Sequence, residues 1–250
     1  MMTSLSDSSS NVSNDYTRFG LYYDAIYAAI RKDYREETAQ IHQIIQQYKQ
    51  SLGNALLDLG CGTGGHAALL EQHYRVEGLD LSPTMLKIAQ EHCPHSTFHQ
   101  GDMTTFDLGR QFDVITCLFS AIGYVQTTAK LNETLQNISR HLLPGGVVVI
   151  EPWLSPEQFT VGHVAGVWVD QPDLIIARMN VGERQGDLSI LDFYFMVATP
   201  NGVEYFTEKH ELGLFSLENY LDAFKKSGLE VIHDPEGITG RGLFVGVRPV

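Results

Sequence analysis

Short apolar runs alternate with helical patterns between residues 55 and 151. A short apolar run bounded by turn residues is typical of a buried strand, whereas apolar positions three and four apart are typical of a helix. The predicted strands are 55–59, 76–80, 97–99, 113–118 and 147–151. The predicted helices between them contain Ala67, Leu69 and Leu70, then Met85, Leu86, Ile88 and Ala89, and then Leu131, Leu135, Ile138 and Leu142. This alternation predicts an α/β fold with a parallel sheet covered by helices on both faces.

The pattern changes after Trp153. Three strand-like segments follow without helices between them, and Gly, Pro, Asn and Asp residues supply turns. The segments are 174–181, 188–199 and 203–215. They predict an antiparallel β meander inserted at about 160–215. A helix at 216–227 and strands at 229–232 and 243–247 then complete the parallel fold.

The chain is predicted to form one domain over residues 14–250 with that insertion. Residues 1–13 are polar and Ser-rich, so they offer little apolar surface to offset ordering entropy, and we expect a disordered tail there. An aromatic segment with Tyr16, Tyr23 and Tyr27 follows. Apolar residues at helical spacing over 34–48 then predict the first long helix.

The most informative stretch is the glycine-rich loop after the first predicted strand, Leu56-Leu57-Asp58-Leu59-Gly60-Cys61-Gly62-Thr63-Gly64-Gly65. Glycines permit a sharp turn and a close ligand approach. Asp80 ends the next strand, twenty residues after Gly60, where a carboxylate accepts hydrogen bonds from ribose hydroxyls. These features predict an adenosine-type ligand. The spacing satisfies both the GxGxxG pattern of nicotinamide enzymes and a GxGxG pattern preceded by an acidic residue.

Further motifs follow in a fixed order and favour the second pattern. They are Leu79-Asp80-Leu81-Ser82, Gly101-Asp102-Met103, Phe112-Asp113-Val114-Ile115 and Leu143-Pro144-Gly145-Gly146. Together with the loop they resemble the class I S-adenosylmethionine (SAM)-dependent methyltransferases. The resemblance implies a Rossmann-like seven-stranded sheet whose last strand is antiparallel, SAM as methyl donor and S-adenosylhomocysteine (SAH) as product. The cofactor-binding residues that it implies are Tyr16, Tyr23, Lys32, Asp58, Gly60, Gly62, Gly64, Asp80, Leu81, Asp102, Met103 and Phe119.

Other blocks are similar to the macrolide aminosugar N,N-dimethyltransferases. These blocks are Phe119-Ser120-Ala121-Ile122-Gly123, Val148-Val149-Ile150-Glu151-Pro152-Trp153 and Gly240-Arg241-Gly242-Leu243-Phe244-Val245-Gly246. The similarity implies a thymidine-diphosphate-linked 3- or 4-aminosugar that is methylated twice on nitrogen. The substrate-binding residues that it implies are Glu151, Trp153, Arg178, His210 and Arg241, with Arg241 on the diphosphate. Arginine suits a diphosphate because its guanidinium binds in bidentate geometry.

Two positions near the expected acceptor depart from that family. Tyr124 stands where the family has His, and Leu154-Ser155 stands in place of aromatic residues. We expect Tyr124 to orient the amine or to relay its proton through water. Four hypotheses remain. They are an aminosugar N-methyltransferase, a methyltransferase of another small metabolite with an O or N acceptor, a SAM-binding protein without catalysis, and, from the alternative glycine pattern, a nicotinamide oxidoreductase.

The amino-acid composition limits the kinds of partner that the protein is expected to bind. The net charge of −13 argues against nucleic acid and anionic membranes, and no apolar run approaches the length of a membrane span. Three cysteines without CxxC spacing fit a reducing cytoplasm. The cluster of His92, Cys93, His95 and His99 matches no common metal-ligand spacing, so we expect no metal. An exposed apolar face on the meander would favour a homodimer, a point that the sequence leaves open.

Overall fold

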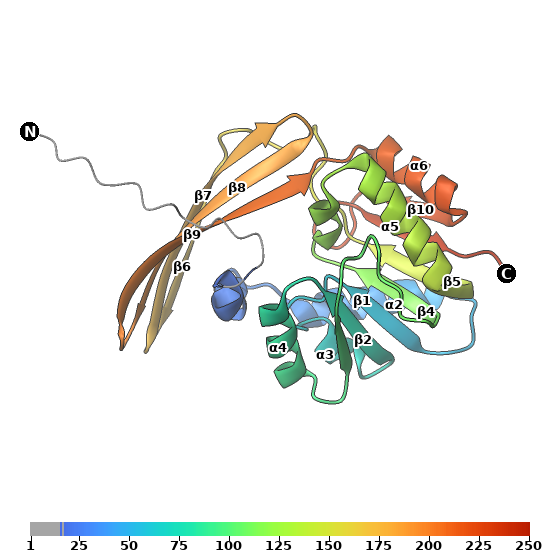
Figure 1. Cartoon of the computed structure of the whole chain (residues 1–250), viewed down its shortest axis with the longest axis horizontal. Coiled ribbons are helices and arrows are strands. Elements are labelled where there is room, and N and C mark those ends of the chain that lie inside the picture. Colours follow the sequence, from blue (N-terminus) through green and yellow to red (C-terminus); the bar gives the residue numbers. More distant parts are fainter. Residues whose placement is uncertain (1–15, 17) are drawn as a thin grey trace, which may run out of the picture.

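The computed structural model describes Tyr16 and residues 18–250, and the tail predicted at 1–13 lies outside these residues. Most of the chain surrounds a seven-stranded sheet (Figure 1). In spatial order its strands are β10 (Glu230–Asp234), β11 (Leu243–Val247), β5 (Leu142–Ile150), β4 (Phe112–Cys117), β1 (Ala55–Leu59), β2 (Arg75–Asp80) and β3 (Thr97–Gln100). Strands β1 to β5 pair in parallel, whereas β11 is antiparallel to both neighbours. The predicted fold class is confirmed.

Helices cover both faces of this sheet. Helices α5 (Thr128–His141) and α6 (Leu217–Ser227) bury their apolar residues on one face, and α2 (Tyr34–Tyr48) and α3 (Ala67–Leu70) on the other. Helix α4 (Pro83–His92) begins as expected, because Ser82 Oγ accepts a hydrogen bond from the Met85 amide and proline occupies the first turn. Among the described residues, no helix is both long and apolar enough to span a bilayer.

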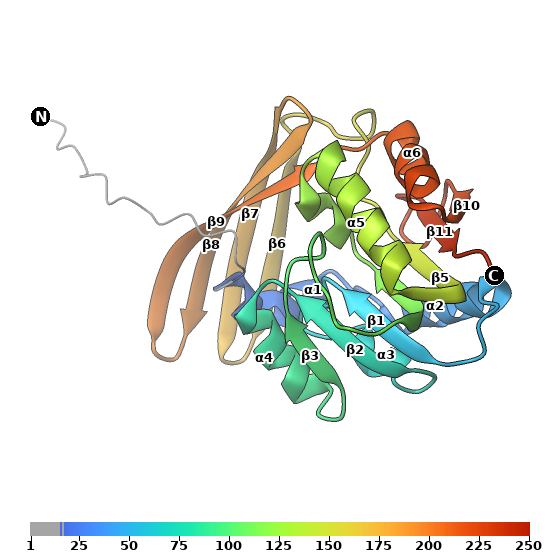
Figure 2. The ribbon, with the colours of Figure 1, turned by 45° about the vertical axis from the view of Figure 1, so that its right-hand side comes forward.

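A second sheet of four antiparallel strands stands beside the first (Figures 1 and 2). Its strands are β6 (Val164–Gln171), β7 (Leu174–Gln185), β8 (Leu188–Thr199) and β9 (Gly202–Gly213). This meander spans 164–213, within the insertion predicted at about 160–215. Sequence analysis missed β6, of which only Val169 is buried, so its apolar pattern is weak.

The N-terminal segment joins the two sheets. It comprises a short 3-10 helix, η1 (Phe19–Tyr22), and α1 (Tyr23–Ala29). Phe19 and Ile26 are fully buried in the inner face of the meander, among Val169, Ile176, Phe193, Phe195, Val197 and Phe206. On its other side, Asp24 Oδ1 accepts a hydrogen bond of 2.7 Å from Thr63 Oγ1 in the glycine loop. The segment therefore touches both the meander and the edge of the parallel sheet.

Candidate active site

A cleft of about 680 Å³ lies between the carboxyl ends of the parallel strands and the inner face of the meander. Residues after β1, β2, β4 and β5 line one side, and residues of β7, β8 and β9 line the other. The segment that includes Tyr16, Tyr23 and Tyr27 covers it. Most of the predicted site residues line this cleft: Tyr16, Tyr23, Gly60, Gly62, Asp80, Leu81, Asp102, Met103, Phe119, Tyr124, Trp153, Arg178, His210 and Arg241.

The glycine loop turns because three of its residues have left-handed backbone conformations. The φ angles of Gly60, Gly62 and Gly64 are +67°, +55° and +80°. Gly60 and Gly62 line the cleft, and a Cβ on Gly62 would meet no atom within 4 Å. Gly64 is outside the cleft lining. It allows the loop to pack on α4, because its Cβ would lie 3.2 Å from the Ala89 Cβ.

Asp80 is held rigidly at the end of β2. Its Oδ1 accepts the Ser82 amide and its Oδ2 accepts the Gly62 amide, each at 2.9 Å. Burial raises the pKa of Asp80, and the backbone hydrogen bonds oppose that rise. A fixed carboxylate beside an open glycine loop suits the ribose hydroxyls of an adenosine ligand. Further along the cleft, Asp102 accepts the Thr104 amide and hydroxyl at 2.8 Å each.

Asp58 lies behind the loop and not on the cleft. It is 3% exposed and accepts a hydrogen bond of 2.7 Å from Thr116 Oγ1, which ties β1 to β4. Burial raises the pKa of Asp58 to about 6, although nearby His66 and the Thr116 hydrogen bond oppose the rise. Its position supports the strand from which the glycine loop starts.

Lys32 is also absent from the cleft lining. Its Nζ hydrogen bonds to Glu37 at 2.6 and 2.9 Å, and Glu37 also contacts His66 Nε2 at 2.8 Å. The Lys32 ammonium lies 3.6 Å from the centre of the Phe119 ring. In this structure Lys32 supports the cleft wall through a cation–π contact with Phe119, and its cofactor-binding role stays a prediction.

Glu151 shapes the loop after β4 from behind. It is 2% exposed, its Oε2 accepts the Phe119 amide at 2.7 Å, and its Oε1 accepts the Thr239 hydroxyl. Phe119 and Ser120 have φ angles of +50° and +65°, a strained conformation that these contacts hold. Glu151 thus positions cleft residues without lining the cleft itself.

Arg241 lines the cleft beside Trp153 and Phe119. Its guanidinium lies 5.3 Å from the centre of the Trp153 ring and 5.6 Å from that of Phe119. Its Nη1 donates to Ser120 Oγ at 2.8 Å. Trp153 is fixed in turn, because its Nε1 donates to Ser189 Oγ at 2.8 Å. These contacts hold a planar cation against the cleft, ready for a bidentate anion.

The roof of the cleft is aromatic and neutral. The Tyr16 and Tyr124 hydroxyls hydrogen bond to each other, and the Tyr23 and Tyr27 rings lie 4.4 Å apart. Burial raises the pKa of Tyr16, Tyr23 and Tyr124 well above the usual tyrosine value, so these side chains stay uncharged at neutral pH. Such a roof excludes water without adding negative charge.

Sequence analysis missed several cleft residues. Tyr27, Phe159, His163 and Asn180 also line the cleft. Asn180 shares the inward-facing alternation of β7 with Arg178, which was the one available signal. Within the described residues, no group of three or more His, Cys, Asp or Glu side chains is placed to hold a metal. His92 and His99 contact Thr63 and Glu77 instead.

Comparisons with known proteins agree with this geometry. A family model described as a methyltransferase domain matches residues 56–146. A dTDP-3-amino-3,6-dideoxy-alpha-D-glucopyranose N,N-dimethyltransferase from Streptomyces fradiae is 39% identical over 90% of this chain and 89% of its own length. A dTDP-4-amino-2,3,4,6-tetradeoxy-D-glucose N,N-dimethyltransferase from Saccharopolyspora spinosa is 38% identical, covering 90% and 91%. The chain belongs to this family of N,N-dimethyltransferases.

Solved structures of similar proteins support the same family. The crystal structure of Streptomyces venezuelae DesVI has a TM-score of 0.87 at 38% identity and covers 94% of this chain and 99% of its own. The SAM-bound structure of CalS10, an amino pentose methyltransferase from Micromonospora echinaspora, has a TM-score of 0.82 at 38% identity, covering 90% and 96%. The predicted family, enzyme class and cofactor are confirmed: this is a SAM-dependent methyltransferase, and SAH is its product.

The glycine loop provides a test of the donor site. Gly62→Ala places a methyl group in the open space of the cleft at a cost of about 1–2 kcal/mol in backbone strain. We expect the affinity for SAH, measured by calorimetry, to fall at least about tenfold, which is about 1.4 kcal/mol. Gly60→Ala should instead cost stability, since its Cβ would lie 2.5 Å from that of Ala121.

The matched control is Gly186→Ala in the turn between β7 and β8. Gly186 has a φ of +61° and equally open surroundings, but it is not part of the cleft. This variant should carry the same strain and bind SAH as the wild type does. Unchanged SAH affinity in Gly62→Ala would remove the loop from the donor site.

Proposed function

We propose that this enzyme methylates the amino group of a nucleotide-linked aminosugar, adding up to two methyl groups. The observation that carries the proposal is Arg241, held on the acceptor side between Trp153 and Phe119 in a chain of net charge −13. A diphosphate needs such a cation, and an arginine in an acidic protein supplies it in bidentate geometry. The substrates named for the Streptomyces fradiae and Saccharopolyspora spinosa relatives support the same class.

The residues of the cleft have separate tasks. Bound SAM supplies a methyl group already activated on a sulfonium. Asp80 and the glycine loop orient the donor, Arg241 anchors the diphosphate, and Tyr124 faces the acceptor amine. Tyr16 and Tyr23 close the cleft over both ligands. Catalysis then consists mainly of holding the reactants in line and excluding water, because an unprotonated amine is a competent nucleophile.

We propose the cellular compartment and the partners of the enzyme from its cysteines and its net charge. Cys61, Cys93 and Cys117 are all buried and unpaired, which supports a reducing cytoplasm. The net charge supports a small-molecule acceptor with neither nucleic acid nor membrane as a partner. We further propose that residues 14–250 act as one domain, since the segment around Phe19 packs against both sheets.

Mass spectrometry of reaction products tests the acceptor class. Purified enzyme is incubated with SAM and, separately, thymidine-diphosphate 3- and 4-aminosugars, the free aminosugars, amino acids and phenols. We expect one and then two added methyl groups on a nucleotide aminosugar only. Methylation of a different acceptor class, with none on the nucleotide aminosugars, would contradict the proposal and leave the donor site intact.

Arg241→Ala tests the diphosphate contact. We expect KM for the nucleotide aminosugar to rise about 10- to 100-fold, with SAH affinity unchanged, because a charged hydrogen-bonded pair contributes about 1.5–3 kcal/mol. Arg110→Ala is the control, since Arg110 is an exposed arginine that pairs with Glu77 away from the cleft. An unchanged KM in Arg241→Ala would exclude the diphosphate role.

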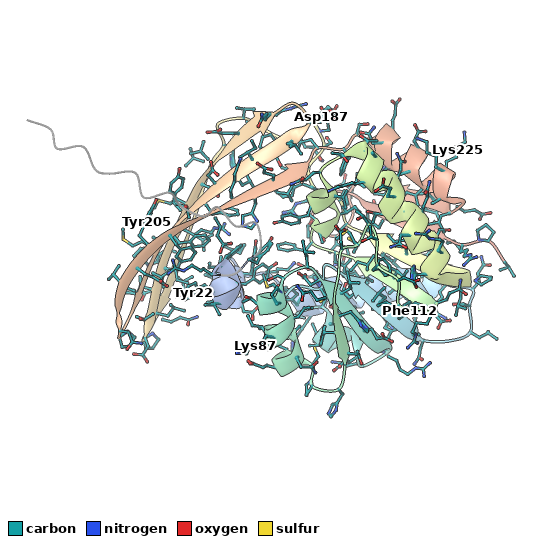
Figure 3. The ribbon with its side chains drawn as sticks, in the orientation of Figure 1. Tyr22, Lys87, Phe112, Asp187, Tyr205 and Lys225 are labelled. Atoms are coloured by element: carbon teal, nitrogen blue, oxygen red, sulfur yellow. The ribbon has the colours of Figure 1, made fainter. Side chains whose placement is uncertain are left out.

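We also propose a homodimer through the outer face of the meander. Alternate residues there expose apolar side chains, with Val164 at 73%, Trp168 at 62% and Tyr205 at 61% exposure. Tyr205 lies on the side remote from the parallel sheet (Figure 3). Further exposed members are Ile175, Met179, Val181, Tyr194, Met196 and Val203. A continuous apolar face of this extent is typical of an interface. In a two-fold symmetric dimer the same face of both copies would meet, so each copy would cover the apolar face of the other.

Light scattering after size exclusion tests this interface. We expect a dimer for the wild type and a monomer for Met196→Glu, because that charge would be buried against the second copy. Leu52→Glu is the control, since Leu52 is fully exposed outside the meander. A monomeric wild type at micromolar concentration would contradict the dimer.

A further inference from the structure

A string of polar side chains runs from the cleft into the meander. The Tyr16 hydroxyl bonds to the Tyr124 hydroxyl, and Tyr124 lies 2.8 Å from His210 Nδ1. On the other side of the imidazole, His210 Nε2 lies 3.7 Å from Glu208 Oε2. The His210 and Glu208 side chains are 1% and 5% exposed. Tyr124 and His210 line the cleft, whereas Glu208 lies behind them.

The far end of this string is incompletely satisfied. His210 Nε2 and Glu208 Oε2 are both buried, and neither has a hydrogen-bond partner among the described residues. Buried polar atoms normally have a hydrogen-bond partner. Two such atoms that face each other without one indicate a functional role, or a hydrogen bond that shortens when substrate is bound. Glu208 can only accept when ionised, which assigns the proton of the neutral imidazole to Nε2. His210 Nδ1 is then the acceptor, and Tyr124 donates to it.

Glu208 also connects this string to the N-terminal segment. Its Oε1 accepts the backbone amides of Arg18 and Phe19 at 3.0 and 2.7 Å. These bonds fix the carboxylate where the segment lies on the meander, and in the same arrangement the Tyr16 hydroxyl contacts the Tyr124 hydroxyl. The string is therefore complete when the cleft is covered.

We propose that Tyr124, His210 and Glu208 form a proton relay that converts the bound acceptor from an ammonium ion to a free amine. This rests on the proposed function, in which the acceptor is an amine. An alkylamine is mostly protonated at neutral pH, and its lone pair is then not available. The ammonium gives one proton to the Tyr124 oxygen as Tyr124 gives its own proton to His210 Nδ1. The products are a neutral amine, a neutral phenol and an imidazolium facing the Glu208 carboxylate.

The surroundings of His210 favour this direction of transfer. Glu208 on its own strand supplies the negative charge, and Phe19 and Phe193 are apolar neighbours that keep water away. Tyr16 and Tyr124 face it as neutral phenols, because burial raises their pKa. Arg178 of β7 carries an opposing charge, and its guanidinium packs on the same Phe193 ring that contacts His210. Glu208 acts as a positioning residue, since it reaches the acceptor only through His210.

The test compares pH profiles of kcat for the wild type, Tyr124→Phe and Glu208→Gln on the nucleotide aminosugar. Both variants keep the side-chain shape, and glutamine retains a carbonyl oxygen for the amides of Arg18 and Phe19. We expect kcat at pH 7 to fall about 100-fold in Tyr124→Phe, at the lower end of the range of general base catalysis, and about 10-fold in Glu208→Gln, because Glu208 acts only through His210. As the pH rises toward the pKa of the acceptor amine, more of the amine is already unprotonated, so the loss in kcat should shrink about tenfold per pH unit. KM and SAH affinity should stay near the wild-type values.

Glu204→Gln is the matched control. Glu204 lies on the same strand and holds the same N-terminal segment, through Tyr22 at 2.6 Å and through Arg18, but it does not contact His210. Its pH profile should equal that of the wild type. A loss in Tyr124→Phe and Glu208→Gln that is the same at every pH, or no loss, would overturn the relay while the proposed function stands. A wild type that methylates no amine would overturn both.

Discussion

The structure depends on one segment that must pack on two surfaces at once. The cleft lies between the strand ends of the parallel sheet and the inner face of the meander, and the segment formed by Tyr16 and residues 18–31 contacts both. Phe19 and Ile26 are buried in the meander, while Asp24 bonds to Thr63 of the glycine loop. Tyr16 and Arg31, at the two ends of the segment, have φ angles of +54° and +59°, a conformation that costs non-glycine residues energy. The packing of Phe19 and Ile26 offsets that cost and keeps the cleft covered.

Charged side chains in a covered cleft are costly to bury without a partner, so most of those near this cleft are paired with other protein groups. Lys32 forms an ion pair with Glu37, and Glu151 accepts hydrogen bonds from a backbone amide and a hydroxyl. Neither charge therefore faces the cleft. Burial keeps the roof tyrosines neutral. The charged side chains that line the cleft include Asp80, Asp102, Arg178 and Arg241, and such carboxylates and arginines suit an adenosine ribose and a diphosphate. Once the acceptor amine is unprotonated, methyl transfer relies on the alignment of the two reactants and on the exclusion of water.

Local pattern predicted the parallel half of the fold well, because helix spacing, caps and the glycine loop are short-range signals. It failed where burial or pairing depends on distant chain segments. Strand β6 was missed since only Val169 is buried in it. Lys32 was expected to bind the cofactor, and nothing in the sequence indicated its contacts in the structure, which are an ion pair with Glu37, five residues further on, and a cation–π contact with Phe119. Glu208 could not be found from sequence, because its partners Arg18 and Phe19 lie about 190 residues away.

The most direct measurement is a crystal structure of the enzyme with SAH and a thymidine-diphosphate aminosugar bound together. The account predicts ribose hydroxyls on Asp80, the diphosphate on Arg241, and the sugar nitrogen beside Tyr124, facing the SAH sulfur with room for a methyl group between them. It also predicts that the segment around Phe19 remains seated on the meander. A sugar nucleotide bound with its diphosphate away from Arg241, or with its amine turned away from the sulfur, would contradict the account.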